Sequence, residues 1–379
     1  MVYLDNAATT FPKPDAVYDA MDQMNRHGAV NPGRGSYRLA KDASKLIDDT
    51  KKELRNLVHT DISSAVVFAP SITIALNQIA HGLNLREKAV VYVSPYEHNA
   101  VARSLHNVAK QKNLIIKEIP INSGFEIDLE SMKYEFIKDK PEAVFCNHMS
   151  NVNGYILPVE IIFAEAKKYG SINVLDTAQS LGLIDVRTDL LSVDVIAFAG
   201  HKSLYGPLGI GGFINVTGIP LEPFISGGTG SDSLNLEMPN GSEAKYEAAS
   251  TNIVAIAGLN AALKEVRPFE TFQHEKELSE YLISQLAGIK EVKLFLPSDL
   301  EKHVGIVSCC IEGYDSEDVG LILDEDFDIA VRTGYHCAPF IHKYFKDEEM
   351  HGTIRISLGQ FSTKKDIDCI IKAIKDLLQ

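Results

Sequence analysis

Hydrophobic runs alternate with amphipathic stretches through the middle of the chain. The hydrophobic runs predict buried strands at residues 89–95, 114–120, 143–150, 172–178, 193–200 and 210–215. Between them, apolar residues at helical spacing predict helices at residues 99–111, 128–137 and 159–170, the last ended by Gly170 as a C-cap. This alternation predicts a mainly parallel sheet that helices cover on both faces.

The pattern changes after about residue 255. Predicted helices at 256–266 and 272–287 precede short predicted strands at 292–297, 305–312, 330–334 and 353–359, and a helix from about Thr363 closes the chain. That helix places one apolar stripe toward a sheet, formed by Ile367, Ile370, Ile371, Ile374, Leu377 and Leu378. We therefore expect an α/β protein with a large domain at 15–255, a smaller α+β domain at 256–379, and an N-terminal segment at 1–14 that joins them.

Length and charge narrow the class of protein. The 379 residues exceed the roughly 250–300 at which single hydrophobic cores stop growing, which also favours two domains. A formal net charge of −14 opposes a general nucleic-acid or anionic-membrane surface, although a local pocket for a small anion stays open. No apolar stretch approaches about 18 residues and the start, MVYLDNAATTFPKP, lacks the features of a signal peptide, so a cytoplasmic protein is expected.

The five cysteines have no CxxC spacing, which favours a reducing compartment over a disulfide framework. Four of them are expected to be small buried hydrophobic residues: Cys146, Cys309, Cys310 and Cys369. The fifth, Cys337, lies in RTGYHCAPF between charged and polar neighbours. It can be a nucleophile, a buried structural cysteine, or a zinc ligand, although His342 completes no zinc pattern with it.

The segment DVIAFAGHKSLYGPLGIGGF is the most informative for chemistry. A predicted strand ends there in Gly-His-Lys, so Lys202 projects from the carboxyl end of a strand, where open α/β sheets bind ligands. A lysine at such a position can be an ordinary surface charge. If its apolar flank removes it from water, its pKa falls and it becomes a nucleophile that forms Schiff bases.

Other predicted strand ends carry polar residues that fit the same chemistry. Asp176 and Gln179 follow one strand, Asn151 follows another and His98 follows a third. An anionic Asp176 can hold a pyridine nitrogen protonated, Gln179 and Asn151 can hydrogen-bond a phenolate oxygen, and His98 can stack on a ring and exchange protons. Together these residue types predict a site for pyridoxal 5'-phosphate.

A phosphate site is predicted as well. FAPSITIALNQIA is a polar turn that opens a helix, so the backbone N–H groups around Ile72 and Thr73, together with the Thr73 hydroxyl, form an anion site.

These motifs occur in an order that resembles a known family. The ordered stretches are YLDNAATT, NPGRGSYRLA, the Thr73 turn, EHNA, SNVNG, LDTAQS, GHKSLYGPLGIG, RTGYHCAP and TIRISLG. Over essentially the whole chain, this order resembles the class V aminotransferases of fold-type I pyridoxal phosphate enzymes. More narrowly, it is similar to the cysteine desulfurase and selenocysteine lyase branch, and RTGYHCA resembles the second, short-loop group of desulfurases.

The resemblance implies a role for each matching residue. Lys202 would bind the cofactor covalently, His98 would stack on it, and Asp176 would pair with its pyridine nitrogen. Gln179 and Asn151 would lie near the phenolate oxygen, and Thr73 and His201 would bind the phosphate. Arg355 would clamp the substrate α-carboxylate, and Asn151 and Arg332 would also bind the substrate. Cys337 would attack the substrate sulfur and become a persulfide.

The chain also departs from the family pattern at three positions. Ala199 stands where a serine is frequent, so one phosphate hydroxyl is absent. Ser250 aligns with a phosphate-binding threonine that the neighbouring subunit lends, and Thr251 is an alternative donor. Tyr335 replaces a histidine that is common in the second group. These departures concern cofactor affinity and substrate detail rather than the reaction class.

The expected function is therefore cysteine desulfuration: L-cysteine becomes L-alanine, Cys337 carries a persulfide, and an unidentified acceptor protein takes the sulfur. A thiolate is the attacking form, and Arg332, His336 or His98 can favour it. The alternatives are a selenocysteine lyase, an aminotransferase or β-lyase that does not use Cys337, and a sulfur-relay protein without catalysis. The presence of Lys202 argues against the last of these.

Assembly is the last expectation. A homodimer is expected because Ser250 makes sense as a phosphate donor only across an interface. Arg34 and Arg38, in NPGRGSYR, either face the mouth of the active site or are solvated loop charges.

Overall fold

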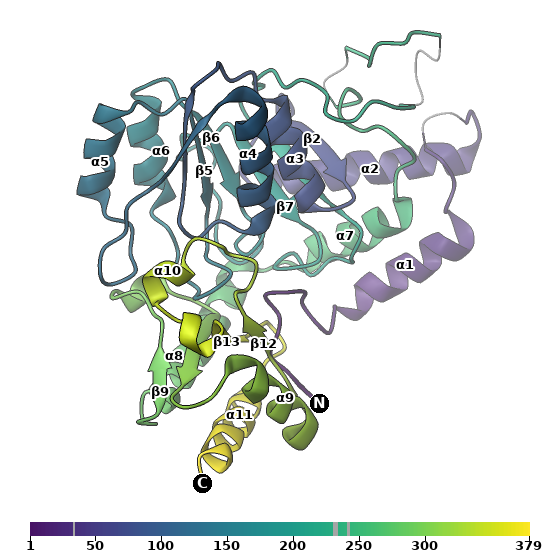
Figure 1. Cartoon of the computed structure of the whole chain (residues 1–379). Helices are drawn as coiled ribbons and strands as arrows, with labels where there is room; N and C mark the ends of the chain where they lie inside the picture. Colours follow the sequence, from purple (N-terminus) through teal and green to yellow (C-terminus); the bar gives the residue numbers. More distant parts are fainter. Residues whose placement is uncertain (33–34, 230–233, 241–242) are drawn as a thin grey trace.

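A seven-stranded sheet organises the larger part of the chain (Figure 1). The computed structural model describes residues 1–32, 35–229, 234–240 and 243–379. The strands follow the order β2-β8-β7-β6-β5-β3-β4. Their bounds are β2 Ala65–Ala69, β3 Val90–Val93, β4 Ile115–Glu118, β5 Ala143–Asn147, β6 Ile172–Asp176, β7 Val195–Ala199 and β8 Gly211–Asn215. Only β8 runs antiparallel to its neighbours, so the predicted mainly parallel α/β sheet is confirmed.

Both faces of this sheet are buried, because successive side chains of a strand point to opposite sides. Phe145 and Ala197 pack with α3 (Ile72–Gly82) and α4 (Asn99–Lys112) on one face. Cys146 and Ile196 pack on the other face, where the covering helices are α2 (Arg38–Leu57), α5 (Leu129–Lys138), α6 (Val159–Lys167) and α7 (Ile253–Glu265). The predicted cover on both faces is thus confirmed. A further helix, α1 (Asp15–His27), packs against α7.

A second sheet lies in the C-terminal part of the chain (Figure 1). It is antiparallel, with the order β12-β13-β10-β9, and its strands are β9 Val292–Leu294, β10 Ile306–Ile311, β12 Arg332–Gly334 and β13 Thr353–Ser357. Its helices are α8 (Pro268–Leu286), α9 (Ser316–Phe327), α10 (His342–Phe345) and α11 (Lys364–Leu377). A short parallel pair, β1 (Val2–Tyr3) with β11 (Ile329–Ala330), ties the N-terminus to this part.

The closing helix α11 begins as the sequence predicts. The Thr363 hydroxyl and the Asp366 carboxylate form a reciprocal capping box at its N-terminus. Four stripe residues are buried against the second sheet, and the last two are partly buried there; the stripe is Ile367, Ile370, Ile371, Ile374, Leu377 and Leu378. The amphipathic prediction for this helix is confirmed.

Some expectations need correction. Helix α6 ends at Lys167, and Gly170 follows in a left-handed conformation with φ of 78° rather than capping the helix directly. Cys369 is exposed on the outer face of α11, whereas Cys146, Cys309 and Cys310 are buried as expected. The division into domains at residue 255 stays a prediction. Within the described residues, no helix is both long and apolar enough to span a membrane.

Candidate active site

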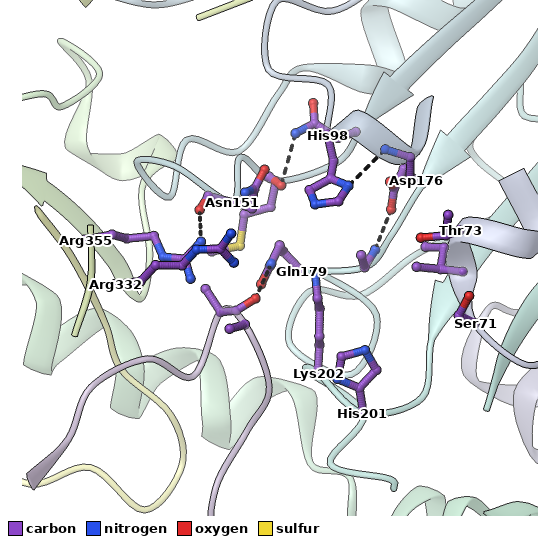
Figure 2. A pocket seen from close by; sticks show the side chains of 17 residues that line it. Ser71, Thr73, His98, Asn151, Asp176, Gln179, His201, Lys202, Arg332 and Arg355 are labelled. Carbon is purple, nitrogen blue, oxygen red and sulfur yellow. Dashed lines mark hydrogen bonds between the residues drawn. The ribbon is translucent and has the colours of Figure 1, made fainter. Parts of the chain in front are cut away.

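A pocket of about 220 Å³ opens where β5, β6 and β7 end (Figure 2). Ten of the residues that the sequence singles out line it: Ile72, Thr73, His98, Asn151, Asp176, Gln179, His201, Lys202, Arg332 and Arg355. The two arginines come from the second sheet. The other residues come from the N-termini of α3 and α4 and from the ends of β5, β6 and β7 or the segments that follow them. The pocket therefore lies between the two sheets, as the topology of open α/β sheets predicts.

Lys202 follows β7 and points into this pocket (Figure 2). Burial lowers the pKa of its amine to about 8, and the nearby Arg355 and Arg332 act in the same direction against the opposing charge of Asp176. The backbone at Gly200 passes so close to Ile210 that a Cβ on this residue would come within 2.8 Å of the Ile210 carbonyl oxygen. Glycine is therefore required just before Lys202. A lysine with such a pKa supplies a substantial fraction of free amine near neutral pH.

Asp176 forms the end of β6 and is buried. One of its oxygens accepts a hydrogen bond from the backbone N–H of Ala178 at 2.8 Å, and burial raises the pKa of the carboxyl. A protonated ring nitrogen facing this group would offset its desolvation. Gln179 donates its side-chain N–H to the Ala7 carbonyl at 2.8 Å, so its amide is oriented by the N-terminal segment.

His98 is the N-cap of α4 and projects into the pocket (Figure 2). Its Nδ1 accepts a hydrogen bond from the backbone N–H of Ala100 at 3.0 Å, so the ring proton resides on Nε2. Burial lowers the pKa of His98 to about 3, and the charges of Lys202 and Arg332 act in the same direction. The ring is therefore neutral, with one N–H available to a ligand.

The start of α3 lies along one side of the pocket together with His201 (Figure 2). The Ser71 hydroxyl caps α3 by accepting from the Ile74 N–H at 3.3 Å, and the amides of Ile72 and Thr73 have no partner within the helix. Nδ1 of His201 is buried and has no hydrogen-bond partner among the described residues. The structure thus brings these groups together where the sequence predicts an anion site, and phosphate binding there stays a prediction.

Two arginines occupy the opposite side of the pocket (Figure 2). Arg355 on β13 and Arg332 on β12 face each other in the antiparallel register. Arg355 is only 1% exposed; its Nη1 donates to the Asn151 carbonyl at 2.9 Å and its Nη2 to Asp5 at 2.6 Å. Its Nε is buried without a partner among the described residues, which leaves a donor for an anionic ligand.

Cys337 lies next to these arginines, at a distance of 3.1 Å from Sγ to Nη2 of Arg332. It is partly buried, and its sulfur accepts a hydrogen bond from this arginine. The zinc alternative finds no supporting geometry: the described residues contain no group of three or more His, Cys, Asp or Glu arranged for a metal, and His342 pairs with Asp347 instead. The buried structural alternative is less favoured because Cys337 adjoins the pocket.

Several residues of interest lie elsewhere. Ser250 is exposed and lines other hollows of the surface together with Thr251, outside this pocket. Arg38 is exposed at the start of α2, away from the residues that line the pocket, and Arg34 lies outside the described residues. Tyr335 is exposed beside Cys337.

Comparison with known proteins identifies the family of this chain. The family model for aminotransferase class-V matches residues 2–370. The chain belongs to the class-V aminotransferase family. A probable cysteine desulfurase from Halalkalibacterium halodurans is 31% identical over 99% of this chain and 92% of its own length. Another from Pyrococcus abyssi is 30% identical over 100% of this chain and 94% of its own length.

Solved structures with a similar fold are also cysteine desulfurases. The apo cysteine desulfurase from Thermococcus onnurineus NA1 superposes with a TM-score of 0.90 at 29% identity, over 99% of this chain and 94% of that one. The cysteine desulfurase CsdA from Escherichia coli gives a TM-score of 0.87 at 25% identity, over 100% of this chain and 94% of that one. The resemblance found in the sequence and the expected fold class are thereby confirmed.

Two residues that contact pocket side chains of this class-V aminotransferase have no role in the sequence-based interpretation. Asp5 and Ala7 lie in YLDNAATT, where they hold Arg355 and Gln179 respectively. The stretch itself belongs to the motif order, but nothing local to it indicates which distant side chains it contacts. Its role becomes visible only when residues about 350 positions apart meet.

Glu97 is a third residue that the sequence left without a role. It precedes His98 and is fully buried, and its Oε1 accepts from the Ser94 hydroxyl at 2.6 Å and the Asn147 N–H at 2.7 Å. Burial raises the pKa of Glu97 to about 8, and the negative charge of Asp176 adds to this effect. Near neutral pH, a proton is therefore held on Glu97 beneath the pocket.

This proton makes stability depend on pH. Between the pKa of an unfolded glutamate, about 4.3, and about 8, the folded protein binds a proton that the unfolded chain releases, so the free energy of unfolding falls as pH rises. We expect Glu97→Gln to remove this contribution, which amounts to at most about 1.4 kcal/mol per pH unit. Urea unfolding at pH 5.5 and 7.5 measures it.

The exposed Glu312→Gln is the matched control, because that carboxyl stays in water on folding. Glu275, whose pKa burial also raises to about 8, contributes equally to wild type and to Glu97→Gln. An unchanged slope in Glu97→Gln would show that Glu97 is ionised in the folded protein.

Proposed function

We propose that this protein is a pyridoxal phosphate-dependent cysteine desulfurase that converts L-cysteine to L-alanine and carries the sulfur as a persulfide on Cys337. The observation that carries the proposal is the position of Cys337, within 3.1 Å of Arg332, at the pocket that holds Lys202. The names of the relatives and of the structural neighbours support the same reaction.

The residues of the pocket fit the cofactor. Lys202 supplies an amine with a pKa of about 8 for covalent attachment, and the buried Asp176 offers an anion to the ring nitrogen. The unpartnered Nδ1 of His201 and the first amides of α3, at Ile72 and Thr73, fit the phosphate. When bound, this cofactor supplies an electron sink that labilises the bonds around the substrate α-carbon.

The protein's own residues orient the substrate and move protons. Arg355 and Arg332 form a cationic wall for the α-carboxylate, and Asp5 fixes the guanidinium of Arg355 from behind. The free amine of Lys202, once displaced by the substrate amine, is placed to take the α-proton. His98 stays neutral, so its Nε2–H can donate to the ligand without adding charge to the pocket.

Sulfur transfer is a displacement at the substrate sulfur. The thiolate of Cys337 attacks it and forms an S–S bond while the substrate Cβ–S bond breaks. The electron pair of the broken bond stays with the β-carbon, which takes up a proton. Return of the α-proton from Lys202 then completes alanine. The persulfide on Cys337 then passes its terminal sulfur to an acceptor thiol.

We propose a homodimer as the assembled form. Ser250 and Thr251 lie outside the pocket of their own chain, which supports a role for their hydroxyls at a partner's phosphate site. The carboxylates of Glu243 and Glu247 accept from the N–H groups of Val66 and Phe68 on the edge strand β2, so the segment before Ser250 is anchored. Sedimentation velocity tests the assembly, and a monomeric active enzyme would refute it.

We expect Asp5→Asn to raise the KM for L-cysteine by on the order of tenfold with a smaller change in kcat. The reason is that Arg355 loses the charged acceptor that orients it, and such hydrogen bonds contribute about 1.5–3 kcal/mol. Steady-state alanine formation measures both constants. Asp328→Asn is the control, because Asp328 pairs with the N-terminus at the surface. An unchanged KM would mean that Arg355 is oriented without Asp5.

The proposed activity itself is tested with both substrates. Purified protein with bound pyridoxal phosphate is given L-cysteine or L-selenocysteine, and alanine is quantified together with the persulfide. Alanine with a persulfide from L-cysteine supports the desulfurase. Alanine only from L-selenocysteine would assign a lyase instead, and amino-group transfer to a keto acid without alanine would assign an aminotransferase.

A further inference from the structure

The turn that presents Cys337 has an uncommon backbone. The N–H of Ala338 donates to the Tyr335 carbonyl at 3.0 Å, which closes a four-residue turn. Both central residues have positive φ, 46° at His336 and 58° at Cys337, as in type I′ turns that normally carry asparagine and glycine. Each such residue costs on the order of 1–2 kcal/mol, so surrounding contacts must hold the turn in place.

Those contacts bind the carbonyl groups of the turn. The His336 carbonyl accepts from the Asn151 side chain at 2.8 Å, and the Cys337 carbonyl accepts from the backbone N–H of Asn99 at 2.6 Å. The Tyr335 carbonyl accepts a second hydrogen bond, from Nε2 of His342 at 3.0 Å. The first two contacts come from pocket elements, whereas the third comes from a residue outside the pocket.

His342 also contacts Asp347, and both side chains are buried, at 5% and 0% exposure. Nδ1 of His342 lies 2.6 Å from Oδ2 of Asp347, and the other carboxylate oxygen has no partner among the described residues. A carboxylate in this environment is stable only if its single partner compensates its charge.

The two contacts of His342 fix the number of protons on the pair. A carbonyl oxygen only accepts, so Nε2 must carry a proton toward Tyr335. At 2.6 Å a second proton must lie between Nδ1 and Asp347, because two lone pairs at that distance would repel. Both ring nitrogens of His342 are thus engaged, Nε2 by the Tyr335 carbonyl and Nδ1 by Asp347.

We propose that His342 is a positioning residue, which links Asp347 to the Tyr335 carbonyl and holds the turn in the conformation that places Cys337 against Arg332. The role in turnover rests on the proposed desulfurase function; the role in the geometry of Cys337 does not. The other titratable groups around the pair are His336, Cys310 and Lys293. Burial keeps His336 and Cys310 neutral, by lowering the pKa of the first and raising that of the second to about 12.

The test uses two variants that separate the hydrogen bond from packing. His342→Phe alone would leave Asp347 buried without a partner, so the double variant His342→Phe/Asp347→Leu removes both polar groups and keeps a ring against Tyr335 and Phe345. In Asp347→Asn, the amide N–H can donate to Nδ1 of a neutral His342, whose Nε2–H still reaches Tyr335.

Two readouts are taken on the enzyme with bound cofactor. One is kcat and KM for alanine formation from L-cysteine; the other is the pH profile of carboxymethylation by iodoacetate, followed on the peptide that contains Cys337 so that the exposed Cys369 does not interfere. We expect the double variant to lose at least tenfold in kcat, with KM and the cofactor spectrum within twofold of wild type. Its carboxymethylation profile should shift, since Cys337 is no longer held against the Arg332 N–H. Asp347→Asn should stay within threefold in kcat.

His351→Gln is the matched control, because the exposed side chain of His351 makes the same kind of pair with Asp315. A double variant with wild-type kcat and an unmoved carboxymethylation profile would overturn the proposal, and so would an Asp347→Asn variant as impaired as the double variant. The carboxymethylation profile decides the geometric role even if wild-type protein forms no alanine, so failure of the proposed function and failure of this inference are distinguishable.

Discussion

Replacing Lys202 with arginine or alanine is expected to lower alanine formation from L-cysteine by on the order of 10³-fold or more. The proposed mechanism uses this one amine twice, for covalent attachment of the cofactor and for removal of the α-proton, and general base catalysis alone contributes about 10²–10⁴-fold. The pKa of about 8 makes Lys202 suitable for both tasks, whereas an arginine stays protonated at that pH.

Lys13 provides a matched control for this prediction. Burial lowers its pKa to about 8 as well, but its ammonium donates to the Thr10 hydroxyl and the His201 carbonyl, and it is not among the residues that line the pocket. After borohydride reduction of wild type, the cofactor should be recovered on the Lys202 peptide. Lys13→Arg should retain that adduct and Lys202→Arg should lose it. An adduct on Lys13 would contradict the assignment.

Cys337→Ser is expected to abolish persulfide formation and to lower alanine formation from L-cysteine by on the order of 10²-fold or more. Without the thiolate, no group beside Arg332 can accept the substrate sulfur, although the pocket that binds substrate stays intact. The spectral change on adding L-cysteine should therefore persist. Stopped-flow absorbance and an alanine assay measure the two steps.

Cys369→Ser is the control, because Cys369 is the exposed thiol on α11 and lies outside the pocket. It should retain full activity. If Cys337→Ser released sulfide and formed alanine at the wild-type rate, a β-lyase mechanism without Cys337 would replace the proposed one.

Much of the pocket could be predicted from the sequence because its residues follow directly on predicted strands. Lys202 comes after the buried run that forms β7, and Asp176 ends the run that forms β6. Parallel strands end at the same edge of a sheet, so the positions of these residues in the chain already imply that they meet. The motif order and the amphipathic closing helix follow from local sequence in the same way.

The rest depends on contacts that no local pattern encodes. The pairing of Asp5 with Arg355 joins the two ends of the chain, and the burial of Glu97 follows from packing of strands that are distant in sequence. The turn at Cys337 carries positive φ at a histidine and a cysteine, so the usual glycine signal for this backbone is absent. The sequence offers His342 only as an incomplete zinc ligand, whereas in the structure its partner is Asp347.

The most direct test of the proposed function is the mass of the Cys337 peptide after a single turnover. Enzyme with bound pyridoxal phosphate is mixed with an equimolar amount of L-cysteine, quenched with an alkylating agent, and digested for peptide mass spectrometry. The proposed mechanism predicts one added sulfur atom on Cys337 and one equivalent of alanine. One equivalent of alanine with free sulfide and unmodified Cys337, or with the sulfur on another cysteine, would contradict it.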